Sequence, residues 1–287
     1  MSVEPKEGSG TSQGAMQRAQ TSEPSPVRRA LSGQRISTVT RGLLGIGVVL
    51  LLWQLLASAN IVNAVLLPAP LALLSAAVDL LGDGTLLRHI GASIERVLVG
   101  VLCAALVGLV FGVLLGWSER LSDYLKPIVE ALRPIPPIAW TPLAILWFGI
   151  GNAPSYFLVF IGAVFPVFVA TYSAVRNIER TQINAALCLG ATPAMLICDI
   201  LIPGALPVIF PGLRIALGVG WMCVVAAELI AAQSGLGYMI QQSRVLLQTQ
   251  NVVTGMIAIG VIGFAMNGIM TIIERRLIPW QESSKGR

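Results

Sequence analysis

Six long apolar runs, separated by short polar segments, constrain this chain more than any other feature of its sequence. They cover residues 42–62, 97–116, 127–150, 155–175, 206–231 and 252–273. A helix needs about 20 apolar residues to cross roughly 30 Å of hydrocarbon. Of all residues 55% are hydrophobic and only 11% are charged, whereas a soluble domain has about 25% charged residues. We therefore predict an all-α integral membrane protein with six transmembrane helices.

Positive charge is distributed unevenly between the segments that join the runs. If the N-terminus is inside the cell, segments 117–126, 176–204 and 274–287 are cytoplasmic and hold most of the loop arginines and lysines. Cytoplasmic loops carry such an excess, so we expect both termini in the cytoplasm. The net charge of +5 is spread over loops and ends rather than over one basic face, and no nucleic-acid partner is expected.

Residues 1–40 are rich in Ser, Gly, Gln, Thr and Pro and have almost no large apolar side chains. This composition predicts a disordered cytoplasmic tail. The transmembrane domain is then expected over residues 41–280, with a second short tail over 281–287. Ala57-Ser58-Ala59 resembles a signal-peptide cleavage site, but the long tail before it opposes that alternative.

The segment between the first two runs contains an apolar stretch, 71–81, that is too short to cross a bilayer. We predict an amphipathic helix on the outer surface, a turn at 82–84, and a helix leading into the second run. The only histidine, His89, falls there, and we interpret it as a surface residue. The four cysteines lack a CxxC spacing, which predicts neither disulfides nor a metal site.

A short helix is predicted in the cytoplasmic segment between the fourth and fifth runs. Ile183, Ala186 and Leu187 share one of its faces, and Gly190 follows as its stop. An isolated helix needs a partner to bury its apolar face. A helix lying on lipid headgroups is the alternative, but it would favour Lys or Arg on its polar face, and residues 181–198 contain neither.

A second short helix is predicted directly after the first. Thr192 fits its N-cap and Pro193 its first helical residue, and we expect Pro203 to end it. Both helices are expected at right angles to the membrane spans.

The spacing in this segment resembles the EAA loop of ABC importer permeases. The family pattern is Glu-Ala-Ala, three residues, Gly, nine residues, and Ile-x-Leu-Pro. Here Asn184-Ala185-Ala186, Gly190 and Ile200-Leu201-Ile202-Pro203 keep the spacing, with Asn184 in place of the glutamate and Ile202 in place of the leucine. The resemblance implies that the loop over residues 181–203 docks on a separate ATPase subunit. The implied contact residues are Ile183, Asn184, Ala185, Ala186, Leu187, Gly190, Ile200 and Pro203.

Other stretches resemble the permeases for nitrate, sulfonate and taurine. The longest is Arg133-Pro134-Ile135-Pro136-Pro137-Ile138-Ala139-Trp140-Thr141-Pro142-Leu143, continuing to Gly151. Residues 67–70, 87–89, 227–229 and 234–238 look like further pieces of the same pattern. The resemblance covers about residues 43–280. It implies the type I, MetI-like importer fold.

The prolines of the third run cannot all lie in one straight helix that faces lipid. Broken backbone at membrane depth is tolerated where protein or water satisfies the freed carbonyls, which makes Pro137, Trp140 and Pro142 candidates for the wall of the solute path. In the alternative interpretation, a helix starts at Pro137 and the earlier prolines lie at the cytoplasmic interface.

Glu228 is a carboxylate inside an apolar run, and such residues are functional candidates by default. We expect it to bond the backbone or an arginine such as Arg96, in a structural or gating role, with Gly235 and Gly237 as further candidates near the gate. Direct contact with solute and simple interfacial exposure stay open as alternatives.

No motif for nucleotide binding, metalloprotease or serine hydrolase chemistry is present, so no catalytic, metal or cofactor residue is predicted. The resemblance implies that ATP is bound by a partner ATPase subunit, and that a periplasmic or lipid-anchored solute-binding protein and a second permease copy complete the importer in the cell inner membrane. The expected solute is a small anion, with sulfonate foremost. An ion-coupled secondary transporter and an intramembrane enzyme are the rival interpretations.

Overall fold

The computed structural model describes residues 44–45, 47–49, 51–59 and 68–279. The predicted tails, 1–40 and 281–287, lie outside these residues, and so does part of the first predicted span, 42–62. The described residues from Ala57 onward form one compact unit. The fold and the sites below belong to the described residues of that unit.

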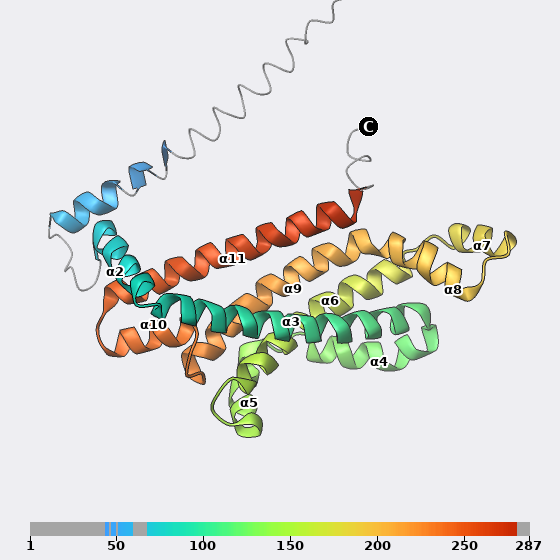
Figure 1. Ribbon diagram of the computed structural model, residues 1–287. Helices are drawn as coiled ribbons and strands as arrows, with labels where there is room; N and C mark the ends of the chain where they lie inside the picture. Colours follow the sequence, from blue (N-terminus) through green and yellow to red (C-terminus); the bar gives the residue numbers. More distant parts are fainter. Residues whose placement is uncertain (1–43, 46, 50, 60–67, 280–287) are drawn as a thin grey trace, which may run out of the picture. The chain divides into compact units, whose positions relative to one another are not determined.

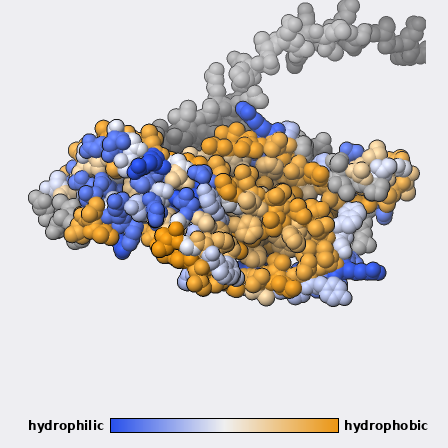
Figure 2. All heavy atoms as spheres, turned by 60° about the horizontal axis from the view of Figure 1, so that its bottom comes forward, coloured by the Kyte–Doolittle hydropathy of each residue, from blue (hydrophilic) through white to orange (hydrophobic). Residues whose placement is uncertain are grey.

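Four helices of this unit are long and apolar enough to cross a membrane. They are α3 (Thr85–Trp117), α6 (Ala153–Arg176), α9 (Ile202–Ile230) and α11 (Thr249–Leu277), which match the second, fourth, fifth and sixth predicted runs (Figure 1). On the face drawn in Figure 2, apolar residues form a broad continuous surface, and hydrophilic residues gather at one end. Lipid is the solvent that such a surface requires.

The third run, 127–150, does not form one spanning helix, so that prediction is wrong. The chain forms α4 (Glu119–Leu132), a non-helical stretch over residues 133–136 that we call the strap, then η1 (Pro137–Trp140) and α5 (Thr141–Phe148). Successive prolines push the preceding residues out of helical backbone, and Pro136 accordingly has an extended ψ of 133°.

A helix does start at Pro137, as the alternative interpretation had it. A Cβ placed on Gly162, in the middle part of α6, would lie 3.4 Å from the Pro137 ring. The start of η1 therefore lies beside the middle part of α6.

Small residues let α3 and α6 approach closely along their whole shared length. Glycines of α3 meet β-branched residues of α6 in four pairs: Gly100 with Val159, Gly108 with Val167, Gly112 with Thr171, and Gly116 with Val175. A Cβ on Gly112 would lie only 2.5 Å from the Thr171 Cβ. These small residues pack within the subunit, where they allow the two helices to approach closely.

The two ends of the bundle carry different elements (Figure 1). α2 (Pro70–Gly82) and α10 (Leu236–Val245) lie at one end, and α7 (Arg180–Cys188), α8 (Pro193–Met195) and η2 (Leu196–Leu201) lie at the other. α2 is the helix predicted over 71–81. After it, the Asp83 carboxylate accepts a 2.8 Å hydrogen bond from the Thr85 amide, which lowers the pKa of Asp83.

Candidate functional site: a buried ion pair, a cavity and a protruding loop

Arg96 of α3 and Glu228 of α9 form an ion pair that is buried inside the bundle. The Arg96 Nη1 atom lies 2.6 Å from Glu228 Oε1, and each residue is 1% exposed. Glu228 also accepts hydrogen bonds from the Ser93 hydroxyl at 2.8 Å and from the Gly237 amide at 2.9 Å. The sequence had suggested Arg96 as a partner for Glu228. Because the carboxylate is enclosed, the alternative of simple interfacial exposure is wrong.

The same cluster fixes the connection between α9 and α10, residues 231–235. Arg96 donates to the Ser234 carbonyl at 2.7 Å and to its hydroxyl at 2.5 Å. The Nη2 atom that donates to the Ser234 hydroxyl also donates to Asn152 Oδ1 at 2.7 Å, just before α6. One guanidinium therefore ties together three segments that are far apart in the sequence, and charge-assisted bonds of this kind are stronger than neutral ones.

His89 belongs to this cluster, which corrects its interpretation as a surface residue. It is 4% exposed, and its Nδ1 atom accepts a 3.0 Å hydrogen bond from the Gly235 amide. One turn further along α3, the Ser93 hydroxyl accepts a 2.9 Å bond from the Leu236 amide. α3 thus presents acceptors for the first amides of α10, groups that a helix start leaves without intrahelical partners.

Gly235 and Gly237 are required by the closeness of Glu228. Gly235 has a φ of +105°, and a Cβ there would lie 2.2 Å from the Glu228 carboxyl carbon. A Cβ on Gly237 would lie 2.6 Å from the Val225 carbonyl oxygen. Any side chain at either position would displace the carboxylate or the backbone.

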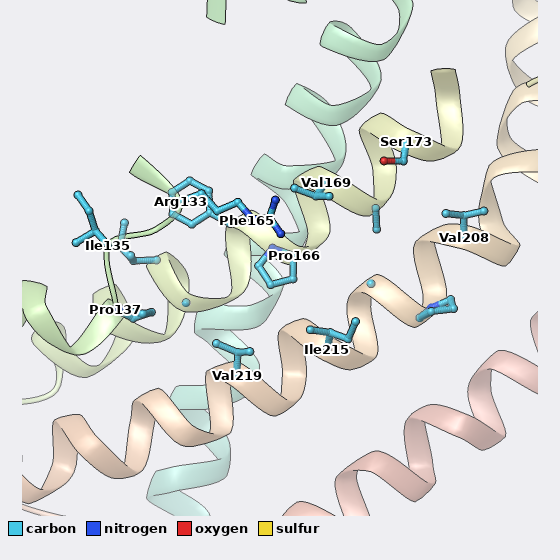
Figure 3. Close-up of a pocket in the computed structure, with 15 residues that line it drawn as sticks. Arg133, Ile135, Pro137, Phe165, Pro166, Val169, Ser173, Val208, Ile215 and Val219 are labelled. Atoms are coloured by element: carbon cyan, nitrogen blue, oxygen red, sulfur yellow. The ribbon is translucent and has the colours of Figure 1, made fainter. Parts of the chain in front are cut away.

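A cavity of about 510 Å³ lies between the strap, α6 and α9 (Figure 3). Pro137, Phe165 and Val219 are among its mainly apolar lining residues, and Arg133 is the only charged one. Two prolines of the spanning helices, Pro166 and Pro211, also line it. Each proline removes one backbone donor, and the freed carbonyls are tolerated at membrane depth where protein or water satisfies them.

The three candidates from the third run do not share one surface. Pro137 lines the cavity. Trp140 instead packs edge-on against Phe157 of α6, with ring centroids 6.5 Å apart, and Pro142 is exposed and does not line the cavity. Glu228, Gly235 and Gly237 form the polar cluster described above. The role of these six residues in a solute path stays a prediction.

The predicted loop 181–203 begins with the helix α7, which ends at a glycine in left-handed backbone. Gly190 has a φ of +84°, its amide donates to the Leu187 carbonyl, and the Ala191 amide donates to the Ala186 carbonyl, both at 3.0 Å. This is the Schellman arrangement that a C-terminal glycine supports. Thr192 caps α8 through a 3.4 Å bond from the Met195 amide.

The second part of the loop differs from the prediction. Pro203 does not end a short helix: the chain passes from α8 through the π-helical turn η2 directly into α9, and Pro203 lies in the first turn of α9. A proline is tolerated in a first turn, because the amide that it lacks has no partner there. Ile200 lies in η2 and is half-buried.

α7 presents apolar side chains to the outside of the unit. Leu187 is 51% exposed, and Leu189, just after the helix, is 89% exposed. Asn184 and Ala185 are also exposed, whereas Ile183 and Ala186 are half-buried. Ile183 lines a cavity together with Gly116, Arg120 and Arg176, so the ends of α3 and α6 meet this loop.

Residues 105–280 match the family described as the binding-protein-dependent transport system inner membrane component. The chain belongs to this family. It is the membrane-spanning permease of an ABC importer, and such a permease works with an ATPase and a binding protein.

Similar proteins cover most of this permease. The taurine transport system permease protein TauC of Escherichia coli is 37% identical over 84% of this chain and 90% of its own. The putative aliphatic sulfonates transport permease protein SsuC of Bacillus subtilis is 36% identical over 86% and 89%. The fold resembles that of the MetNI methionine ABC transporter, a structure solved in an inward-facing conformation, with a TM-score of 0.58 and 21% identity over 68% of this chain and 95% of that one.

Sequence reasoning missed several members of the polar cluster. Ser93, Asn152 and Ser234 carry no motif of their own, and they join the cluster only because α3, α6 and the 231–235 connection meet. His89 and Arg96 are seven residues apart, which places both on one face of a helix. That spacing was the one sequence signal that could have linked His89 to the buried pair.

Proposed function

We propose that this permease imports a small organic sulfonate, with taurine and short alkanesulfonates as the main candidates, across the cell inner membrane. We infer this class of solute from the similarity to the TauC and SsuC permeases over more than four fifths of the chain. In the proposed assembly, two copies of this chain form the path as a homodimer, a closed two-fold arrangement that a single permease chain favours. Both termini are then cytoplasmic, with α7 on the ATPase side.

The loop 181–203 is the proposed coupling element. Its exposed Leu187 and Leu189 are large apolar side chains on a short helix at one end of the bundle. A short isolated helix in water is marginal, and an apolar groove on a partner would stabilise it. Arg180, the first residue of α7, is the only basic residue over 180–198. A protein groove therefore suits the helix better than anionic lipid headgroups, which would favour several Lys or Arg on its polar face.

Motion in the ATPase would reach the bundle through continuous helix. α8, η2 and α9 follow one another without a break from Pro193 to Ile230, so a displacement of the loop moves α9 along its length. α9 carries Glu228 near its far end. In this proposal the α9 helix joins the ATPase contact at one end to the polar cluster at the other, as one rigid element of alternating access.

Uptake into proteoliposomes tests the solute class. The permease would be reconstituted with its ATPase and with the solute-binding protein encoded beside it, and taurine, an alkanesulfonate and nitrate would be compared. We expect ATP-dependent uptake of at least one sulfonate at a rate well above that of nitrate. Uptake of nitrate alone, or of a neutral solute alone, would contradict the sulfonate assignment.

A further inference from the structure

Arg133 is exposed in the single chain and lines the cavity between the strap, α6 and α9. It directly follows α4, which starts two residues after the end of α3 and packs back along it. Fourteen residues of helix carry the chain back by about 21 Å at roughly 1.5 Å per residue. The cavity residues nearest the middle of α6, Phe165 and Pro166, share the same lining as Arg133 (Figure 3). Arg133 is therefore close to mid-depth of a hydrocarbon layer about 30 Å thick.

Arg133 has no acidic partner within the part of the chain that the structure describes. By contrast, Arg96 pairs with Glu228, Arg176 with Glu119, and Arg214 with Glu274. The guanidinium cannot lose its charge, and from mid-depth its side chain is too short to reach either interface, about 15 Å away. An unpaired charge at this depth faces a water-filled cavity or a ligand.

We propose that Arg133 is the anion-binding residue of the translocation path, and that it holds the oxyanion group of the solute while the solute crosses the cavity. The lining of this cavity is otherwise apolar apart from Ser173, so the guanidinium supplies its only positive charge. A guanidinium presents parallel N–H donors that match a planar or tetrahedral oxyanion. This inference rests on the proposed function, because it assigns a residue to the import of an anion.

The test measures the charge preference of a thiol placed in the cavity. V169C would be introduced in a cysteine-free importer, with ATPase, in nanodiscs, where both faces are accessible. The two probes are the anionic 2-sulfonatoethyl methanethiosulfonate and the cationic 2-(trimethylammonium)ethyl methanethiosulfonate. The first probe is itself a sulfonate. The measured quantity is the ratio of the two reaction rates, anionic over cationic.

We expect R133Q to lower this ratio about fivefold or more, because a nearby unit charge acts on the two probes in opposite directions. R133K should keep most of the preference, since it keeps the charge. S118C, at the turn between α3 and α4, is the matched control, and its ratio should not respond to R133Q. An unchanged ratio at V169C would overturn the proposal.

Two further measurements separate this inference from the proposed function. If V169C reacts with neither probe and forms a disulfide between two copies, the cavity is covered by the second subunit and the proposal is wrong. If the ratio falls in R133Q but the parent importer takes up no anion, the anion site stands and the import proposal fails. If both hold, R133Q should reduce sulfonate uptake at least tenfold while the ATPase still co-purifies.

Discussion

Replacing Glu228 by Gln removes the charge from the centre of the polar cluster while keeping the side chain's size. The parent carboxylate accepts from Arg96, from Ser93 and from the Gly237 amide. The oxygen of a glutamine side chain can keep one or two of these bonds, but the NH2 group of the same side chain then faces groups that are themselves hydrogen-bond donors. Arg96 keeps its bonds to Ser234 and Asn152 but has no counter-charge.

The expected cost follows from the burial of the pair. Both residues are 1% exposed, and removing one partner of a buried ion pair costs about 3–5 kcal/mol. At about 1.4 kcal/mol per factor of ten, the lower figure corresponds to roughly a hundredfold change in a local opening equilibrium. The segment that opens is the connection between α9 and α10, because its amides bond directly to this cluster.

Hydrogen exchange in nanodiscs measures that opening. The amides of Gly235, Leu236 and Gly237 donate to His89, Ser93 and Glu228 respectively, so their exchange should accelerate about a hundredfold in E228Q. Membrane insertion should be normal, because loss of the charge lowers the desolvation cost. Solute uptake should fall.

The matched control is Glu95→Gln. Glu95 precedes Arg96 on α3 and accepts only an exposed 2.9 Å bond from the Tyr156 hydroxyl. Amide exchange at residues 235–237 and solute uptake in this variant should therefore match the parent. In the double variant R96Q/E228Q, the amides of residues 235–237 should recover part of their protection from hydrogen exchange, because this variant leaves no unpaired charge. If E228Q showed parental exchange at these amides, the pair would not hold the connection, and the cluster would have no gating role.

Two further predictions concern the membrane topology and the packing of the bundle. Cysteines at Ser118 and Ser284, the latter outside the described residues, should be shielded from an impermeant thiol reagent in intact cells, whereas one at Gly84 should react; external labelling of S118C would reverse the orientation. G112A should lower the thermal midpoint of the purified importer, since its Cβ would lie 2.5 Å from Thr171 Cβ and overpacking costs about 1–3 kcal/mol. The control G91A, also inside α3, meets nothing within 4 Å and should not lower that midpoint, because alanine is a better helix former than glycine. Equal midpoints for the two variants would show that α3 and α6 are not closely packed.

Lipid explains why the spans were predictable from the sequence. The hydrocarbon thickness fixes the length of an apolar helix. α3, α6 and α11 contain their predicted runs, and α9 contains all of its run except residue 231. The third run misled this argument because Pro127 lies inside α4, where the sequence predicted the start of a span. Apolar length alone does not distinguish one helix from two helices joined by a strap.

The polar cluster could be predicted only in part. A buried carboxylate needs a partner, which pointed to Arg96, but Ser93 and Glu228 are 135 residues apart and no periodicity links them. His89 was misinterpreted because composition favours an exposed histidine. Pro203 was expected as a helix stop, whereas the backbone before it is already helical at Leu201, with φ −68° and ψ −50°. Both errors concern tertiary context that local patterns do not contain.

Co-purification of the ATPase with loop variants, together with solute-stimulated ATP hydrolysis, tests the account most directly. G190V forces a β-branched side chain into left-handed backbone, where a non-glycine residue costs on the order of 1–2 kcal/mol, and A186E places a carboxylate against the docking surface. Both should insert normally and lose association or stimulated hydrolysis. N184E, which restores the residue of the family pattern, is the control and should keep both. Full association and full stimulated hydrolysis in G190V and A186E alike would contradict the claim that residues 181–203 couple this permease to its ATPase.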